Sequence, residues 1–190
     1  MANTNSPFGF KPVSHLIGGP GNWTVKTYSI ASGYAADIGM GDPVEQTGTA
    51  DNVQLAAAGN ADNLGIFAGV EYTDSNGRAQ WSESWTSGTT GTNIKAKIIV
   101  DPYVIYEVQA DSAAANDIGA LADWVAGSVS SVNGRSGAYL EVSSTATSGK
   151  SMVVLGKVDR PDNAFGAYCK VYAMFREHNL LTGATGAGGV

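Results

Sequence analysis

The string Ser148-Gly149-Lys150-Ser151 comes closest to a known chemical motif, because it ends like the phosphate-binding loop of nucleotide-binding proteins. That loop also requires a glycine five residues before Gly149, and this position holds Ser144. A helix should follow the loop, whereas the segment from Met152 to Leu155 is apolar and typical of a strand. The string therefore predicts a hairpin turn rather than a nucleotide-binding site.

The histidines and the cysteine do not suggest catalysis or metal binding. His15 and His178 are the only two histidines, so no His/Cys cluster has the spacing of zinc ligands. A Ser-His-Asp triad would need one of these two, and Gly134-Arg135-Ser136-Gly137 lacks the spacing of a nucleophile elbow. We expect both histidines to hydrogen-bond locally. The single Cys169 lies in an alternating apolar stretch and is predicted to pack in the core.

The carboxylates follow the pattern of turns rather than that of an acid–base pair. Many of the 17 Asp and Glu residues adjoin Gly, Asn or Pro, as Asp42 does, and in turns such residues accept hydrogen bonds from their own backbone. A weak calcium site among Asp51, Asp62 and Asp74 is an alternative, but no Asp-x-Asp-x-Asp-Gly loop is present. We therefore predict no catalytic residue, no metal site and no cofactor, and we expect that the chain is not an enzyme.

Two of the four tryptophans have a spacing that suggests a common role. Trp81 and Trp85 would share one face of a continuous strand, with Glu83 between them. Both could pack in the core or at the base of a loop. Alternatively, they anchor an interface, since Trp is enriched where binding energy concentrates. Trp81 and Trp85 are therefore candidate interface residues.

The composition limits the class of protein that these residues can belong to. Charged residues make up 15% of the 190 residues and 25 residues are Gly, which argues against a helix-rich protein. The 43% of hydrophobic residues argues against a disordered chain. The net charge is −6, and no basic stripe is present, so we expect no binding to nucleic acid or to anionic membranes. No signal peptide is expected at the start of the chain, which predicts synthesis in the cytoplasm.

Strand patterns dominate the chain and predict a compact β-barrel or β-sandwich of about ten short strands. The turn Asp74-Ser75-Asn76-Gly77 predicts a hairpin, and Ser112 to Asp117 predicts a helix of one or two turns, with an extension toward Trp124 left open. The predicted strands are residues 23–30, 43–46, 52–56, 64–72, 78–83, 94–98, 103–109, 138–142, 152–158 and 168–176.

The sequence divides into three parts. Residues 1–22 contain three prolines and scattered apolar residues, which predicts an extended N-terminal arm that lies on its own domain or on a neighbouring chain. Residues 23–180 form the β-rich domain, with two subdomains that meet near residues 90–102 as an alternative. Residues 181–190 are expected to be a flexible Gly/Ala tail. The candidate interface residues of the arm are Phe8, Phe10, Val13 and Leu16.

The opening string Phe8-Gly9-Phe10-Lys11-Pro12-Val13-Ser14-His15-Leu16 resembles the start of a family of tailed-bacteriophage virion proteins, the head decoration or capsid cement proteins. Further strings in matching order extend the resemblance over most of residues 7–180. They are residues 28–30, 41–44, 65–72, 106–111, 117–119, 155–163 and 170–171.

The resemblance implies a β-rich domain that binds the outer surface of an assembled capsid, commonly as a homotrimer that bridges subunits of the major capsid protein. It implies no active site. The acidic, base-poor composition suits the outside of a DNA-filled shell. One alternative is a receptor- or glycan-binding protein of the phage tail or fibre, which should show an aromatic platform in a groove. A hydrolase is a third possibility, against which the scarcity of histidine counts.

Overall fold

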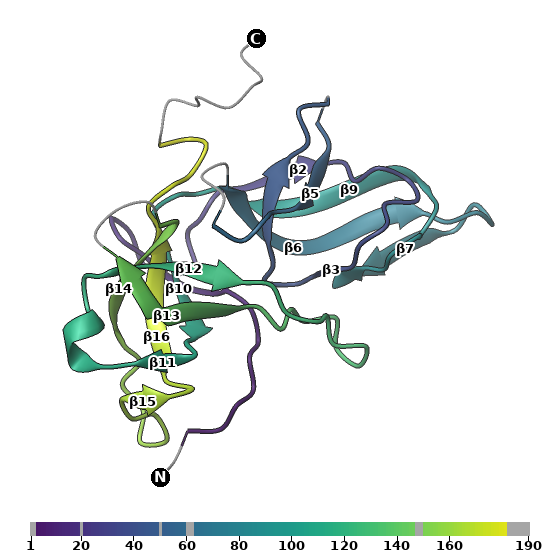
Figure 1. Cartoon of the computed structure of the whole chain (residues 1–190). Coiled ribbons are helices and arrows are strands. Elements are labelled where there is room, and N and C mark those ends of the chain that lie inside the picture. The colour runs from purple at the N-terminus through teal and green to yellow at the C-terminus, as the bar shows by residue number, and fades with distance from the viewer. Residues whose placement is uncertain (1–2, 20, 50, 60–62, 147–149, 182–190) are drawn as a thin grey trace.

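The computed structural model describes residues 3–19, 21–49, 51–59, 63–146 and 150–181. Over these residues the fold is mainly β, with several antiparallel sheets and, as its only helix, the single 3₁₀ turn η1 (Ala115–Asp117). The arrangement is consistent with a β-sandwich, and these residues form no closed barrel. Two six-stranded sheets make up most of the molecule (Figure 1).

Sheet I combines the start of the chain with its second half. Its strands follow the order β1-β10-β16-β14-β12-β13, and all neighbours are antiparallel. The sheet curls, since an isolated bridge between Ala110 and Leu140 brings the end of β10 to β13. The strands are β1 (Lys11–His15), β10 (Val104–Gln109), β12 (Leu121–Val125), β13 (Tyr139–Ala146), β14 (Met152–Lys157) and β16 (Lys170–Phe175).

Sheet II contains only strands from the first half of the chain. Its order is β2-β9-β6-β4-β5, and the hairpin strand β7 pairs with the far end of β6. The strands are β2 (Val25–Tyr28), β4 (Pro43–Gln46), β5 (Val53–Leu55), β6 (Asn63–Thr73), β7 (Ala79–Ser82) and β9 (Thr92–Ile99). Two short pairs complete the fold: β3 (Ile38–Gly39) with β8 (Ser84–Trp85), and β11 (Ser112–Ala113) with β15 (Gly166–Ala167).

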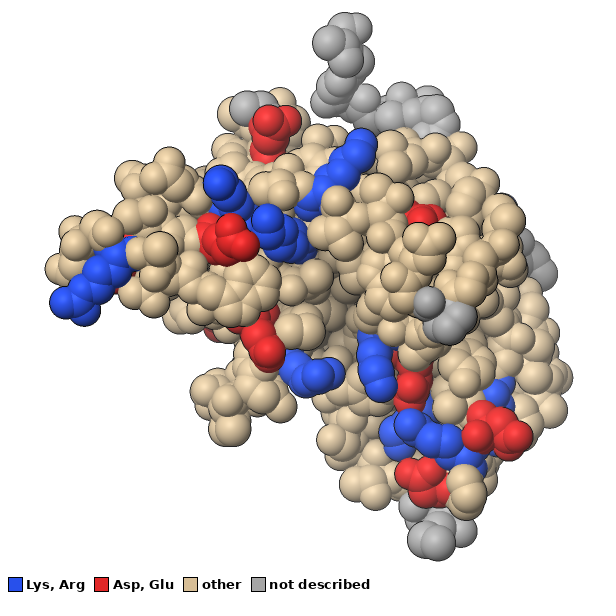
Figure 2. Space-filling model, turned by 180° about the vertical axis from the view of Figure 1, so that it is seen from behind, with Lys and Arg blue, Asp and Glu red and all other residues tan. Residues whose placement is uncertain are grey.

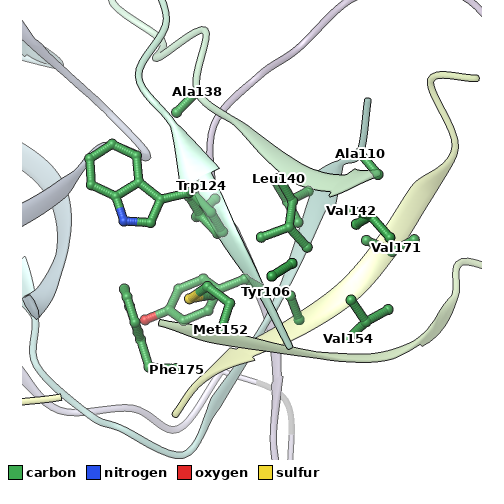
Figure 3. Packing of buried hydrophobic residues seen from close by; sticks show 14 of the residues in the cluster. Tyr106, Ala110, Trp124, Ala138, Leu140, Val142, Met152, Val154, Val171 and Phe175 are labelled. Carbon is green, nitrogen blue, oxygen red and sulfur yellow. The ribbon is translucent and has the colours of Figure 1, made fainter. Parts of the chain in front are cut away.

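Two hydrophobic clusters fill the molecule, one built mainly on sheet I with Ile66 and Ile99 of sheet II, and one built on sheet II. The concave side of sheet I holds Tyr106, Trp124 and Phe175, together with aliphatic side chains from all its central strands (Figure 3). Phe10 joins this cluster, with its ring centroid 6.1 Å from that of Tyr106 and 6.5 Å from that of Phe175. The second cluster lies on one face of sheet II and contains Trp85. Cys169 is fully buried in the first cluster, which confirms its predicted place in the core.

The loop of residues 126–138 connects the two sheets. It leaves sheet I after β12 and reaches across to β3, beside sheet II (Figure 1). Ser136 donates its backbone N–H to the Met40 carbonyl (3.0 Å) and its hydroxyl to the buried Asp42 carboxylate. Asp42 also accepts the Gly39 N–H at 2.7 Å. These buried hydrogen bonds fix the position of one half of the molecule against the other.

All ten predicted strand regions contain a strand, and the turn at residues 74–77 joins β6 to β7 as predicted, but the predicted helix needs correction. The predicted helix is reduced to η1, because the extension toward Trp124 forms strand β12, which pairs with both β13 and β14. Residues 11–15 of the predicted arm form the edge strand β1 and pair with β10, so this part of the arm lies on its own domain, which is one of the two predicted alternatives. The predicted flexible tail lies, from residue 182 on, outside the described residues.

The stability of this fold should depend on pH through His178. This histidine is fully buried against Phe175, and burial lowers its pKa from 6.5 to about 4. Between these two values the unfolded chain binds the proton and the folded chain does not, so the folded state loses stability as the pH falls. We expect urea unfolding to give a stability about 2 kcal/mol lower at about pH 4.5 than at about pH 7.

The variant His178→Gln removes this titration, and the amide of the glutamine can still hydrogen-bond. Its stability should change less than that of the wild type over the same pH interval. Equal pH slopes in the two proteins would show that other groups, and not His178, set the acid sensitivity.

Candidate interaction surface

Side chains that could together hold a metal ion do not come together in the described part of the chain. Over these residues no three His, Cys, Asp or Glu side chains are grouped so that they could hold a metal ion. Asp62, part of the suggested calcium site, lies outside the described residues. Likewise, no helix in the described part is long and apolar enough to span a membrane.

The string that resembles a phosphate-binding loop has a different role where the structure describes it. Residues 147–149 lie outside the described part. Lys150 forms an ion pair with Asp123 of β12 (2.9 Å), and strand β14 begins at Met152 in place of the required helix. Lys150 is therefore engaged within sheet I, and the secondary structure does not match that of a nucleotide site.

The two histidines hydrogen-bond locally, as predicted. His15 Nδ1 accepts the backbone N–H groups of Ile17 (3.2 Å) and Gly18 (3.0 Å), while its Nε2 lies 3.1 Å from the Asp101 carboxylate. His178 Nδ1 accepts the N–H of Leu180 at 3.1 Å. The His15 bonds shape the loop after β1, whose side chains Leu16 and Ile17 are 53% and 76% exposed.

Two carboxylates serve turns, as the sequence predicts. Asp74 accepts the N–H groups of Asn76 and Arg78 at 2.9 Å and the Gln80 amide at 3.0 Å. These hydrogen bonds, the one from Arg78 above all, hold the pKa of Asp74 below its ordinary value. Asp42 shows the opposite shift, because burial raises the pKa of its carboxyl. Neither carboxylate is therefore arranged as half of an acid–base pair.

Two of the six candidate interface residues are buried, so those two predictions are wrong for this fold. Phe10 and Trp85 are each 1% exposed and fill the two hydrophobic clusters. Trp85 does not share a face with Trp81, because the chain leaves sheet II at Glu83 and pairs next with β3. Phe8 is half-buried and lines a hollow of about 190 Å³ next to the loop of residues 126–138.

Val13 and Leu16 lie on or beside the convex side of sheet I, whereas Trp81 lies on β7 of sheet II. On β16 and the first part of β14, alternate residues face the core and the residues between them are half-exposed. On β10 the half-exposed outward residue is Ile105, whereas Glu107 and Gln109 are buried. The outward positions are mostly apolar, and several line a hollow of about 250 Å³ together with Val13 of β1. Leu16, Ile17 and Tyr103 lie next to it, where β1 ends and β10 begins. We define the outer apolar face as Val13, Ile105, Val153, Leu155, Tyr172 and Met174.

The outer apolar face departs from the usual pattern of an antiparallel sheet. Such a sheet normally alternates between apolar residues toward the core and polar residues toward water. Here Val153 and Met174 face each other across β14 and β16, both on the outward side. Apolar surface exposed in one continuous area marks a place where another molecule binds. The surface therefore has the chemistry of a protein–protein interface.

A network of ion pairs borders this face. Glu107, at an outward position of β10, is 7% exposed and pairs with Arg160 at 2.8 Å. Arg160 Nε lies 3.7 Å from Asp162. Asn163 fixes the loop that carries Arg160, because its amide donates to the carbonyls of Val158 and Lys170 at 2.8 Å. Figure 2 shows charged side chains of both signs gathered in groups, with wide areas between them that carry few charges.

Comparisons with protein-family models, with curated proteins and with solved structures give no match for this chain. The sequence reasoning missed Ile105, Leu155 and Tyr172 as interface candidates. A usable signal was present, since β14 begins with the apolar run of residues 152–155 and β10 with that of residues 104–106, which is typical of strands that are buried on both faces.

The Arg160–Glu107 pair should stabilise this border. The change Arg160→Ala leaves the Glu107 carboxylate nearly buried without its cation, and we expect a loss of about 2 kcal/mol in the free energy of unfolding. The double variant Arg160→Met with Glu107→Met removes both charges and should recover most of that loss. Chemical denaturation measures both effects. An Arg160→Ala protein as stable as the wild type would contradict this role.

Proposed function

We propose that the protein is a virion structural protein that binds the outer surface of an assembled phage capsid and stabilises it. The observation that carries the proposal is the outer apolar face, which has the chemistry of a protein-binding surface. The resemblance of residues 7–180 to head decoration proteins supports the same role. The partner is then the major capsid protein.

The charge of the chain supports a location on the outside of the shell. With 11 basic and 17 acidic residues, the protein would be repelled by the DNA that fills the interior. Several of the basic side chains also form ion pairs, since Lys97, Lys150 and Arg160 each lie within 4 Å of a carboxylate. The surface that meets the capsid is therefore proposed to be apolar rather than basic.

The start of the chain contributes to the proposed interface as part of sheet I. Residues 11–15 pair with β10, so Val13 and the neighbouring Leu16 are held beside the outer apolar face. Pro12 lacks a backbone N–H and weakens the free edge of β1 as a site for strand addition. Side-chain contacts of the face, and not pairing at this edge, then bind the capsid.

The protein would stabilise the capsid by binding only to its assembled form. A protein that binds the assembled capsid and not its free subunits favours the assembled state by mass action. A homotrimer that bridges several capsid subunits would present the outer apolar face three times, and multivalency then converts weak single contacts into stable attachment.

Binding to heads assembled without this protein tests the proposal. Wild-type protein should bind such heads with a fixed stoichiometry, measured by sedimentation and gel densitometry. Leu16→Asp and Tyr172→Ala should each weaken binding by about tenfold or more, because they place a charge beside the apolar contact or remove its aromatic group.

Val132→Asp is the matched control, because Val132 is 93% exposed at the tip of the loop of residues 126–138, away from the outer apolar face. It should bind heads like the wild type, and thermal unfolding should show that all variants are folded. A wild-type protein that binds neither heads nor the major capsid protein would overturn the proposed function. Full binding by Tyr172→Ala and Leu16→Asp would exclude the outer apolar face as the contact.

A further inference from the structure

A second surface, on sheet II, has the features of a small-ligand site and is separate from the outer apolar face. At the far end of the sheet, a groove of about 590 Å³ runs over strand β6 between β7 and β9. Glu71 and Thr73 of β6 lie along it, with Trp81 on one side and Lys95 on the other, as the strand register requires. We call this the Trp81 groove. Its volume is in the range of sites that bind small molecules.

The indole of Trp81 forms a fixed aromatic platform in this groove. Its six-membered ring lies against Gly69, where a Cβ atom would be only 2.8 Å from Cζ2 and Cη2. Gly69 has a φ of +125°, which other residues rarely adopt, so the close seat for the ring depends on this glycine. The Trp81 side chain nevertheless remains 56% exposed. One part of the ring is thus held by the sheet and the rest is available to a ligand.

The polar groups along the groove are held in place by neighbours. The Gln80 amide donates to Asp74 at 3.0 Å, and the Asn93 amide donates to the Thr73 hydroxyl at 3.5 Å. Asn93 has a φ of +52°, a left-handed conformation that Asn adopts more readily than most residues. The Asn93 amide therefore lies in the groove with limited freedom, whereas Gln80 pairs with Tyr72 and its side chain points to the opposite face of the sheet from Trp81.

The two charged side chains of the groove, Glu71 and Lys95, differ in whether an opposite charge lies close by. Glu71 lies 3.8 Å from Lys97, which offsets its charge. No carboxylate of the described residues lies within 4 Å of the Lys95 ammonium group, although Lys95 is directly opposite Glu71 in the register. The groove therefore offers one cation to a ligand that carries a negative group.

We propose that the Trp81 groove binds a pyranose unit that carries a carboxylate, such as a uronic acid in a polysaccharide. The C–H bonds of the sugar ring carry partial positive charge and pack on the negative face of the indole. The Asn93 amide binds a hydroxyl group, and Lys95 binds the carboxylate. This activity does not depend on capsid binding, because it uses a different sheet.

Isothermal titration with two matched probes tests the proposal on the full-length protein. Tetraglucuronic acid and cellotetraose differ in whether the exocyclic carbon is a carboxylate or an alcohol. We expect the acidic probe to bind at least about tenfold more tightly than the neutral one. Trp81→Ala should weaken binding of the acidic probe by about 30-fold or more. Lys95→Met should abolish the preference for the acidic probe.

Two control variants separate the groove from general effects of charge and aromatic surface. Lys26→Met removes a lysine from the opposite face of sheet II, since Lys26 pairs with Ile98 of the buried cluster. Phe165→Ala removes an exposed aromatic group beside β15. Both should bind the acidic probe like the wild type. Absence of binding by the wild type, equal affinity for the two probes, or unchanged binding by Trp81→Ala would overturn the assignment, whatever the result with heads.

Discussion

Strands β14 and β16, together with Ile105 of β10, carry apolar side chains on both faces of sheet I, and this constraint governs the architecture. One face must be buried for the chain to fold, and the curl of sheet I encloses it together with Phe10 and the aromatic cluster. The other face has only the half-burial that neighbouring side chains of the same sheet provide. A sheet of this kind is complete only when a second surface covers it. The proposed attachment to a capsid supplies that surface.

Much of the fold could be predicted from local patterns, because short β-branched and aromatic segments form strands nearly wherever they occur in this chain. The predictions fail where pairing with distant strands, rather than the local sequence, determines which residues form a strand. Strand β1 contains Pro12 and is recognised only by its pairing with β10, and β12 follows an alanine-rich segment but pairs on both sides. The interface prediction failed for Trp85 because alternation assumes a continuous strand, and the chain changes sheets at Glu83.

The distribution of charge shows a similar limit of sequence reasoning. Residues 1–94 hold three basic and eight acidic residues, which suggests that the two halves of the sequence face different surroundings. In the fold, residue 94 does not mark the boundary between the two sheets, because Lys95 and Lys97 follow it in the sequence and belong to sheet II. The immediate surroundings of each lysine differ: Lys97 forms an ion pair with Glu71, whereas Lys95 faces the Trp81 groove. The two surfaces thus differ in chemistry, one apolar and one suited to an acidic sugar, and they lie on different sheets.

The central claim, that the outer apolar face meets the capsid, is tested most directly by hydroxyl-radical footprinting of the protein free and bound to heads. Tyr172 and Met174 are half-exposed and chemically reactive, and they lie on this face. The account predicts that both lose most of their reactivity on heads saturated with the protein, while Trp81 remains reactive. Unchanged reactivity of Tyr172 and Met174 on saturated heads would contradict it.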